Sequence, residues 1–143
     1  MFSSNIIGAN VKHFTYGLIA VLIGMGILDG AWLSFAVSRL YRPGIGHLMS
    51  ERPNAWAALA FYLLYAAGVS YLVVQPALAA RLPGEAFLRG GVLGLIAYGT
   101  YDLTSLAVLR GWPLSVTVID MVWGMILTGV SAGIATLVVL RLV

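Results

Sequence analysis

The sequence of 143 residues contains no cysteine, which excludes disulfide bonds, thiolate metal ligands, cysteine nucleophiles and S-acylation. Charge is scarce as well, because only 9% of the residues are Asp, Glu, Lys or Arg, against about 25% in soluble domains. Apolar side chains dominate instead: 61% of the residues are hydrophobic, and the mean hydropathy is +0.97. This composition indicates a membrane protein.

Four long apolar stretches carry this composition, at about residues 14–38, 54–80, 85–109 and 114–140. Each is longer than the roughly 20 residues that a helix needs to cross the hydrocarbon layer. The net charge of +3 is spread over their ends, a pattern that fits membrane surfaces better than nucleic acid. We expect an all-α polytopic membrane protein with a single domain, residues 1–143.

The connections between the stretches are short, so consecutive helices should be antiparallel neighbours in an up-down-up-down bundle. The longest connection, 40–53, contains Pro43 and Gly44, which predict a turn. Pro76 is expected to interrupt the helical hydrogen bonds late in the second span. The first stretch follows basic residues as a signal peptide does, but it is too long and lacks a small-residue cleavage site, so we interpret it as a span.

Three aspartates, Asp29, Asp102 and Asp120, lie inside these apolar stretches. A carboxylate near the bilayer centre costs roughly 2.5 to 3.5 kcal/mol, which makes each of them a candidate for function. Counting residues from the first and third connections places all three about 10 to 15 Å from the same membrane face. At this depth the second span contributes Tyr62 and Tyr65. The sequence therefore predicts one polar layer built by all four helices.

Aromatic side chains surround this predicted layer. Asp29 and Trp32, and likewise Asp120 and Trp123, are spaced as Asp-x-x-Trp, which places an indole N–H one turn from a carboxylate. We expect the acceptor of each indole to lie across the bundle and not on the same helix. The candidate residues for binding a ligand, ion or proton are Asp29, Asp102, Asp120, Trp32, Trp123, Tyr62, Tyr65, Tyr98 and Tyr101.

The loop residues contribute weaker candidates. Arg42 is the nearest basic residue that could fold inward toward the aspartates, since no Lys or Arg lies within the spans at their depth. His47 would need partners such as Glu51 to hold a metal, and two residues do not make a site, so no metal site is predicted. The aromatic residues near the span ends are interpreted as interface anchors: Tyr16, Tyr41, Trp56, Tyr71 and Trp112.

Glycines predict close contacts between helices. Gly26 and Gly30 form a small-xxx-small pair on the first span, and Gly90 and Gly94 form another on the third. Such pairs serve contacts within one chain or between chains. A homodimer or a larger membrane complex is therefore an expected partner, together with the lipid bilayer.

Three segments resemble a known family: YRPGIGHLM after the first span, FYLLYAAG in the second, and YDLTSLAVLRGWPLSVTVIDMVWG across the third and fourth. The chain resembles the bacterial membrane proteins grouped as domain-of-unknown-function family 2177, over nearly its full length. The resemblance implies a small four-helix, multi-pass protein of the bacterial inner membrane. It brings no reaction, cofactor or catalytic residue to carry over, so any cofactor stays unknown.

Several functions fit these residues. The carboxyls could be protonated, or they could be ionised and accept hydrogen bonds or hold a cation. The first hypothesis is that the polar layer binds or moves a small amphipathic molecule, a lipid headgroup, a cation or a proton. The second is an accessory subunit of a larger membrane complex, whose glycine faces pack against partner helices. The aspartates could also serve only as hydrogen bonds that fix the register of the helices. The third is an enzyme that uses paired carboxylates on a lipid, although the layer has no histidine.

Overall fold

The computed structural model describes residues 2–143, and it describes side chains from residue 8 onward. Within this part of the chain every regular element is helical, and no strand forms. Four helical segments are long and apolar enough to cross a membrane, which confirms the all-α prediction with four spans. These segments are Gly8–Leu48, Ala55–Ala80, Pro83–Val108 and Leu114–Leu142.

Two of the four segments change helix type along their length. The first consists of α1 (Phe2–Ala36), the π-helical turn η1 (Val37–Tyr41), α2 (Arg42–Ile45) and the 3-10 turn η2 (Gly46–Leu48). The second consists of α3 (Ala55–Val69), the π-helical turn η3 (Ser70–Val74) and α4 (Gln75–Ala80). The third and fourth are the single helices α5 (Pro83–Val108) and α6 (Leu114–Leu142).

The predicted turn at Pro43 and Gly44 is wrong, because the helix continues through both residues to Leu48. Proline lacks an N–H, and its ring collides with the carbonyl four residues earlier in an α-helix. Both Pro43 and Pro76 come two residues after a π-turn, whose hydrogen bonds reach back five residues and whose backbone is wider. The wider turn accommodates the proline, so each helix continues where the sequence pattern predicted a break.

Helices α5 and α6 form the closest pair in the fold, and glycines make this possible. A Cβ on Gly94 would lie 2.1 Å from the carbonyl oxygen of Gly124, and one on Gly90 would lie 2.9 Å from that of Thr128. The prediction that Gly90 and Gly94 allow close packing is therefore confirmed within the chain. Gly26 and Gly30 differ, since a Cβ on either would meet nothing within 4 Å.

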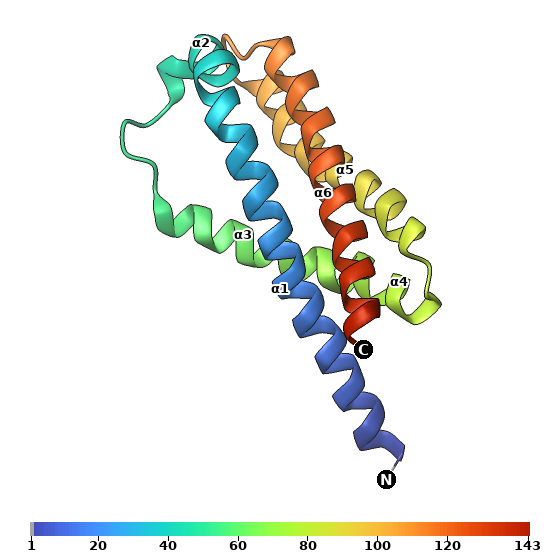
Figure 1. The fold of residues 1–143 in the computed structure, drawn as a ribbon. Helices are drawn as coiled ribbons and strands as arrows, with labels where there is room; N and C mark the ends of the chain where they lie inside the picture. Colours follow the sequence, from blue (N-terminus) through green and yellow to red (C-terminus); the bar gives the residue numbers. More distant parts are fainter. Residues whose placement is uncertain (1) are drawn as a thin grey trace.

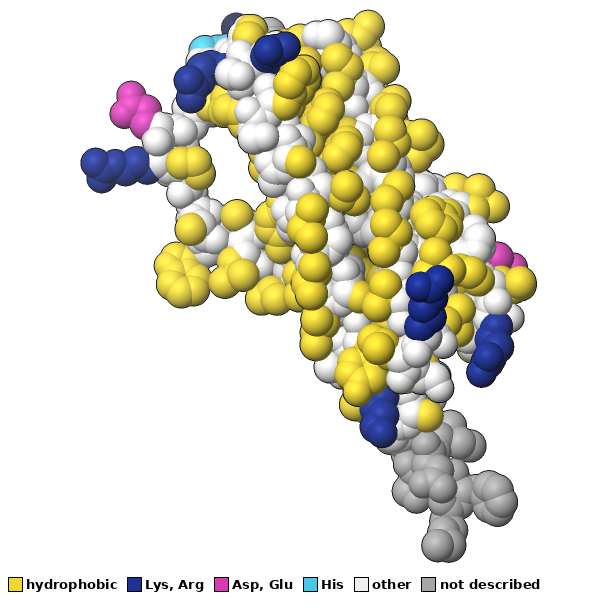
Figure 2. Space-filling model, in the orientation of Figure 1, with side chains coloured by type: hydrophobic (Ala, Val, Ile, Leu, Met, Phe, Trp, Pro, Cys, Tyr) yellow, Lys and Arg dark blue, Asp and Glu magenta, His cyan; other side chains and the backbone are white. Residues whose placement is uncertain are grey.

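Helix α1 packs along α6, whereas α3 crosses α1 obliquely (Figure 1). Helix α3 is largely uncovered from Ala55 to Leu64, and Trp56 and Leu64 expose 80% and 77% of their surface. Figure 2 shows the segment that leads into α3 standing away from α1. Most of the buried residues of this span lie in its second half, from Ala66 onward. Ser70 donates to the carbonyl of Phe14 at 2.9 Å.

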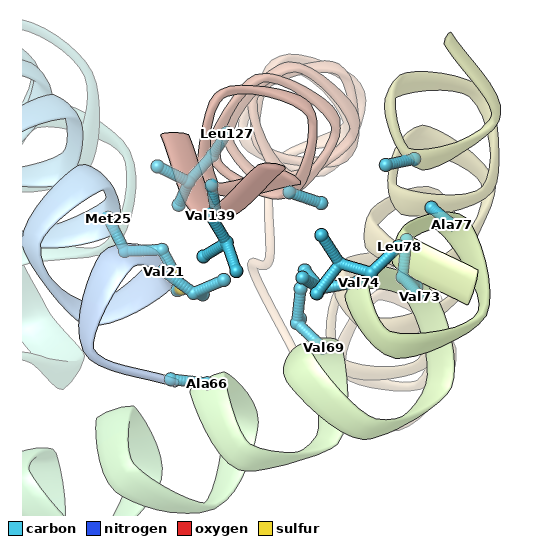
Figure 3. Close-up of a cluster of buried hydrophobic side chains, with 13 residues drawn as sticks. Val21, Met25, Ala66, Val69, Val73, Val74, Ala77, Leu78, Leu127 and Val139 are labelled. Atoms are coloured by element: carbon cyan, nitrogen blue, oxygen red, sulfur yellow. The ribbon is translucent and has the colours of Figure 1, made fainter. Parts of the chain in front are cut away.

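A core of mostly small and branched apolar side chains joins the four spans (Figure 3). It receives Val21 and Met25 from α1, Val69 from α3, and Leu127 and Val139 from α6. All five are fully buried. Along the helix axes the core lies next to the level of the aspartates. Its packing therefore fixes the positions of the helices that carry the carboxyls.

Candidate functional site

Asp29 on α1 is almost completely buried, with 8% of its surface exposed, and it accepts two hydrogen bonds from different helices. The hydroxyl of Tyr62 on α3 donates to its Oδ2. The indole Nε1 of Trp123 on α6 donates to its Oδ1 at 3.0 Å. Both carboxylate oxygens therefore have a partner, and both partners are neutral. This carboxyl ties α1, α3 and α6 together at one point.

Asp120 on α6 is equally buried, and it accepts a hydrogen bond from the hydroxyl of Tyr41. The same hydroxyl accepts from Nε1 of Trp32 at 3.0 Å. The interpretation of Tyr41 as an interface anchor is therefore wrong, because its hydroxyl lies between an indole and a carboxylate. Tyr41 is the residue of the site that sequence reasoning missed.

The position of Tyr41 depends on the π-turn that it ends. In an uninterrupted α-helix the nine residues from Trp32 to Tyr41 make about two and a half turns, so the two side chains would lie on opposite faces. The π-turn adds a residue without a matching rotation and brings Tyr41 round toward Trp32. Pro43 was the signal in the sequence, since a proline indicates either a helix end or a wider turn just before it.

The two indoles connect these two aspartates. Trp32 and Trp123 stack with ring centroids 4.6 Å apart and planes inclined by 11°. Trp123, on the helix of Asp120, donates directly to Asp29. Trp32, on the helix of Asp29, donates to Tyr41, which in turn donates to Asp120. The expectation of an acceptor across the bundle is thus confirmed for Trp123. It is wrong for Trp32, whose direct acceptor lies further along its own helical segment.

Asp102 on α5 is the exception among the three carboxyls. It is completely buried, and neither Oδ1 nor Oδ2 has a hydrogen-bond partner. The carboxyl of Asp120, across the α5–α6 contact, lies close enough to act on it. A buried ionised carboxylate without donors or a cation is too costly to persist, so this group requires a bound proton or another positive partner.

Two further tyrosines complete the layer without reaching an aspartate. Tyr65 shares a hydrogen bond of 2.8 Å with the hydroxyl of Thr128, which is fully buried on α6. Tyr98 packs its ring against Gly124, where a Cβ would lie 2.2 Å from the ring. The Tyr98 ring also meets that of Tyr65 edge-on at 6.5 Å. These contacts make Tyr65 and Tyr98 supports of the layer.

Tyr101 does not belong to the layer. More than half of its surface is exposed, and its ring packs edge-on against Trp112 at 5.6 Å. The prediction that Tyr101 lines the polar layer is wrong, because its side chain leaves the helix on the outer face, next to the α5–α6 connection. Trp112 in turn is buried and donates to the hydroxyl of Thr117 at 3.1 Å, so it is no interface anchor.

The candidates from the loop after the first span also lie outside the polar layer. Arg42 and His47 are both exposed. Among the described residues the single ion pair joins Arg89 to Glu85 at 2.9 Å, one helical turn apart on the outside of α5. Among the same residues no group of three His, Asp or Glu is placed to hold a metal ion. Arg42, the basic residue considered able to fold inward, does not do so, and its neighbour Tyr41 reaches Asp120 instead.

The fold and the buried aspartate layer define a polytopic α-helical membrane protein with an intramembrane carboxyl site. The chain belongs to the family described as predicted membrane protein DUF2177, whose model matches residues 14–137. No curated protein and no solved structure matches the chain. The matched region contains all three aspartates and both stacked indoles.

Proposed function

We propose that the protein binds and releases a proton inside the membrane, at the carboxyl pair of Asp102 and Asp120. The observation that carries this proposal is the complete burial of Asp102 with both of its oxygens unpartnered. A proton neutralises such a group without needing the room that a larger cation or ligand takes. Each titration of the pair changes the charge of the bundle interior, which is how intramembrane carboxyls serve pumps and transporters.

The geometry favours a proton over the larger ligands. Asp29, Asp102 and Asp120 expose 8% of their surface or less, so an amphipathic molecule or a lipid headgroup has no access to them here. A hard metal cation takes six or more oxygen ligands, and Asp120 already has one oxygen engaged with Tyr41. The carboxyl of Asp102 lacks the further oxygens that would complete such a shell.

The rest of the layer supports this role by holding Asp120 in place. Tyr41 donates to Asp120 and is itself fixed by Trp32, so the carboxyl of Asp120 has a neutral donor on one side and Asp102 on the other. When the proton leaves the pair, the Tyr41 hydroxyl remains as a donor that stabilises the charge on Asp120. This donor partly offsets the repulsion between the two carboxylates that release of the proton creates.

Infrared difference spectroscopy of the reconstituted protein tests the proposal. Protonated carboxyls have a carbonyl stretch that ionised carboxylates lack, so we expect a band that appears as the pH falls and disappears as it rises. Asp102→Asn should remove this band, and Asp120→Asn should shift it. Glu85→Gln, which alters the exposed pair with Arg89, is the control and should leave the band unchanged. A band that ignores pH, or that survives in Asp102→Asn, would contradict proton exchange at this pair.

A second candidate, a subunit that assembles through its helices, is favoured by the open face of α1. Gly26 and Gly30 are exposed and have nothing within 4 Å of their Cβ positions, although small residues at this spacing serve helix packing. Because the chain has no cysteine, Gly26→Cys gives a unique cross-linking position. Disulfide-linked species in native membranes would support assembly here. An equal yield from Gly84→Cys, which lies at a helix end, would show random collision.

A further inference from the structure

A groove of about 450 Å³ runs between α1 and α6. Its volume lies within the range of about 300 to 1,000 Å³ that is typical of ligand sites. Branched apolar side chains form its walls, among them Ile19, Ile23 and Ile27 of α1 and Ile134 and Val138 of α6. Such a surface takes an aliphatic chain.

The groove leads into a second hollow whose lining is basic. Tyr16 and Leu142 line both cavities, so the apolar groove opens into a hollow of about 540 Å³ near the start of α1. Lys12 and His13 line that second hollow. An apolar slot with a cationic end is complementary to a long apolar chain that carries a negative head.

The length of the groove matches one leaflet of a bilayer. Along α1 it extends from Tyr16 to Leu28, twelve residues or roughly 18 Å. Half of a hydrocarbon core of about 30 Å is about 15 Å. Lys12 lies one further turn beyond Tyr16, at the level where a phosphate would stand. The deep end of the groove stops at Leu28, next to Asp29 and the polar layer.

Ser131 is the polar side chain at the floor of the groove, facing Gly24. Its hydroxyl has no partner in the observed rotamer. A helical serine can turn its hydroxyl to the carbonyl four residues earlier, so it needs no polar atom from a ligand. The floor therefore accepts an aliphatic chain.

We propose that this groove holds one acyl chain of an anionic glycerophospholipid, with the phosphate beside Lys12. The site is separate from the carboxyl pair and does not depend on proton exchange there. It is also separate from the other lipid-facing hollows. A hollow of about 280 Å³ that contains Gly68, between α3 and α5, has only apolar residues and Tyr65 in its lining.

Native mass spectrometry of the detergent-solubilised full chain tests this, with phosphatidylglycerol and phosphatidylcholine of identical acyl chains as probes. We expect one phosphatidylglycerol to be retained in preference to phosphatidylcholine. A basic residue near a membrane surface contributes about 1 kcal/mol to anionic lipid binding, so Lys12→Gln should weaken phosphatidylglycerol retention about fivefold and leave phosphatidylcholine unchanged.

A second set of variants, tested with the same two lipids, fills the groove. Gly24 lines the groove, and a Cβ on it makes only ordinary contact, 3.6 Å from Ser131, so we expect Gly24→Leu to occupy part of the groove and to abolish the retained lipid. Gly68→Leu fills the other hollow and is the matched control, which should retain the lipid. Circular dichroism and the unfolding temperature show whether each variant folds.

Three results would overturn the proposal. Equal retention of both lipids would show ordinary solvation of an apolar surface. Loss in Gly68→Leu equal to that in Gly24→Leu would remove the assignment to this groove. Dimers that persist without lipid, and that Gly24→Leu disrupts, would show that a second copy of the chain fills it.

Discussion

Trp32 and Trp123 stack face to face, 4.6 Å between ring centroids, although 91 residues separate them in the chain. The stack holds together the two halves of the polar layer, because Trp123 donates to Asp29 and Trp32 donates to the tyrosine that serves Asp120. Stacking and hydrogen bonding thus act on the same two side chains. The layer should respond to substitution as one unit.

A double-mutant cycle measures the coupling between the two stacked indoles. We expect Trp32→Leu and Trp123→Leu to be non-additive, with a coupling free energy of about 0.5 to 1.5 kcal/mol, which is the usual range for aromatic pairs. Unfolding titrations in sodium dodecyl sulfate micelles measure it. The same cycle with Trp56, which is 80% exposed, in place of Trp32 is the control and should give no coupling. Full additivity of Trp32 and Trp123 would refute the stack.

Tyr41→Phe removes one hydroxyl and two hydrogen bonds. Asp120 loses its donor and the Trp32 indole loses its acceptor, so the free energy of unfolding should fall by about 1 to 3 kcal/mol. Tyr71→Phe, at an exposed position of the other π-turn, should change it by less than about 0.5 kcal/mol. Equal stability of the two variants would mean that Tyr41 does not reach Asp120.

Asp102→Asn should be tolerated by the fold. The amide has the shape of a protonated carboxyl and carries no charge, so the free energy of unfolding should change by less than about 1 kcal/mol near neutral pH. Thermal unfolding in detergent measures the effect, with Asp102→Leu as the comparison that also changes shape. A large loss in Asp102→Asn would indicate that the folded protein holds this group ionised, against a cation.

The α5–α6 contact should distinguish two glycines three residues apart. Gly94→Ala places a methyl group 2.1 Å from a backbone oxygen, so the helices must separate, and we expect a loss of about 3 kcal/mol or more. Gly91→Ala meets only ordinary contacts, from 3.6 Å to Met125, and should gain up to about 1 kcal/mol from helix propensity. Folding yield and unfolding free energy of both variants check this, and equal effects would contradict the packing.

The sequence predicted the parts of this protein that depend on composition and on residue counts. Four spans follow from apolar length, and the common depth of Asp29, Asp102 and Asp120 follows from the helical rise. The close approach at Gly90 and Gly94 follows from side-chain size. The sequence did not predict which way a side chain points when this depends on the rotation of the helix about its axis. Tyr101 is the example, since it lies one residue from Asp102 yet on the outer face.

Pro43 is a second example of a feature that the sequence alone did not predict correctly. Pro43 predicted an end to the first helix, but a π-turn carries the helix past it and turns Tyr41 toward the interior. Proline chemistry alone does not choose between a break and a wider turn, because both relieve the same collision. The choice depends on what the continued helix gains, here the bond from Tyr41 to Asp120.

By itself, the sequence determined that this is a helical membrane protein with three carboxyls at one depth, because hydropathy and helical rise act along the chain and need no partner. Only the tertiary structure decided that Asp29 and Asp120 are satisfied by neutral donors while Asp102 is left without any. Hydrogen-bond partners come from other helices, and their rotation is set by packing at glycines and π-turns. The unpartnered carboxyl of Asp102 is a product of that packing.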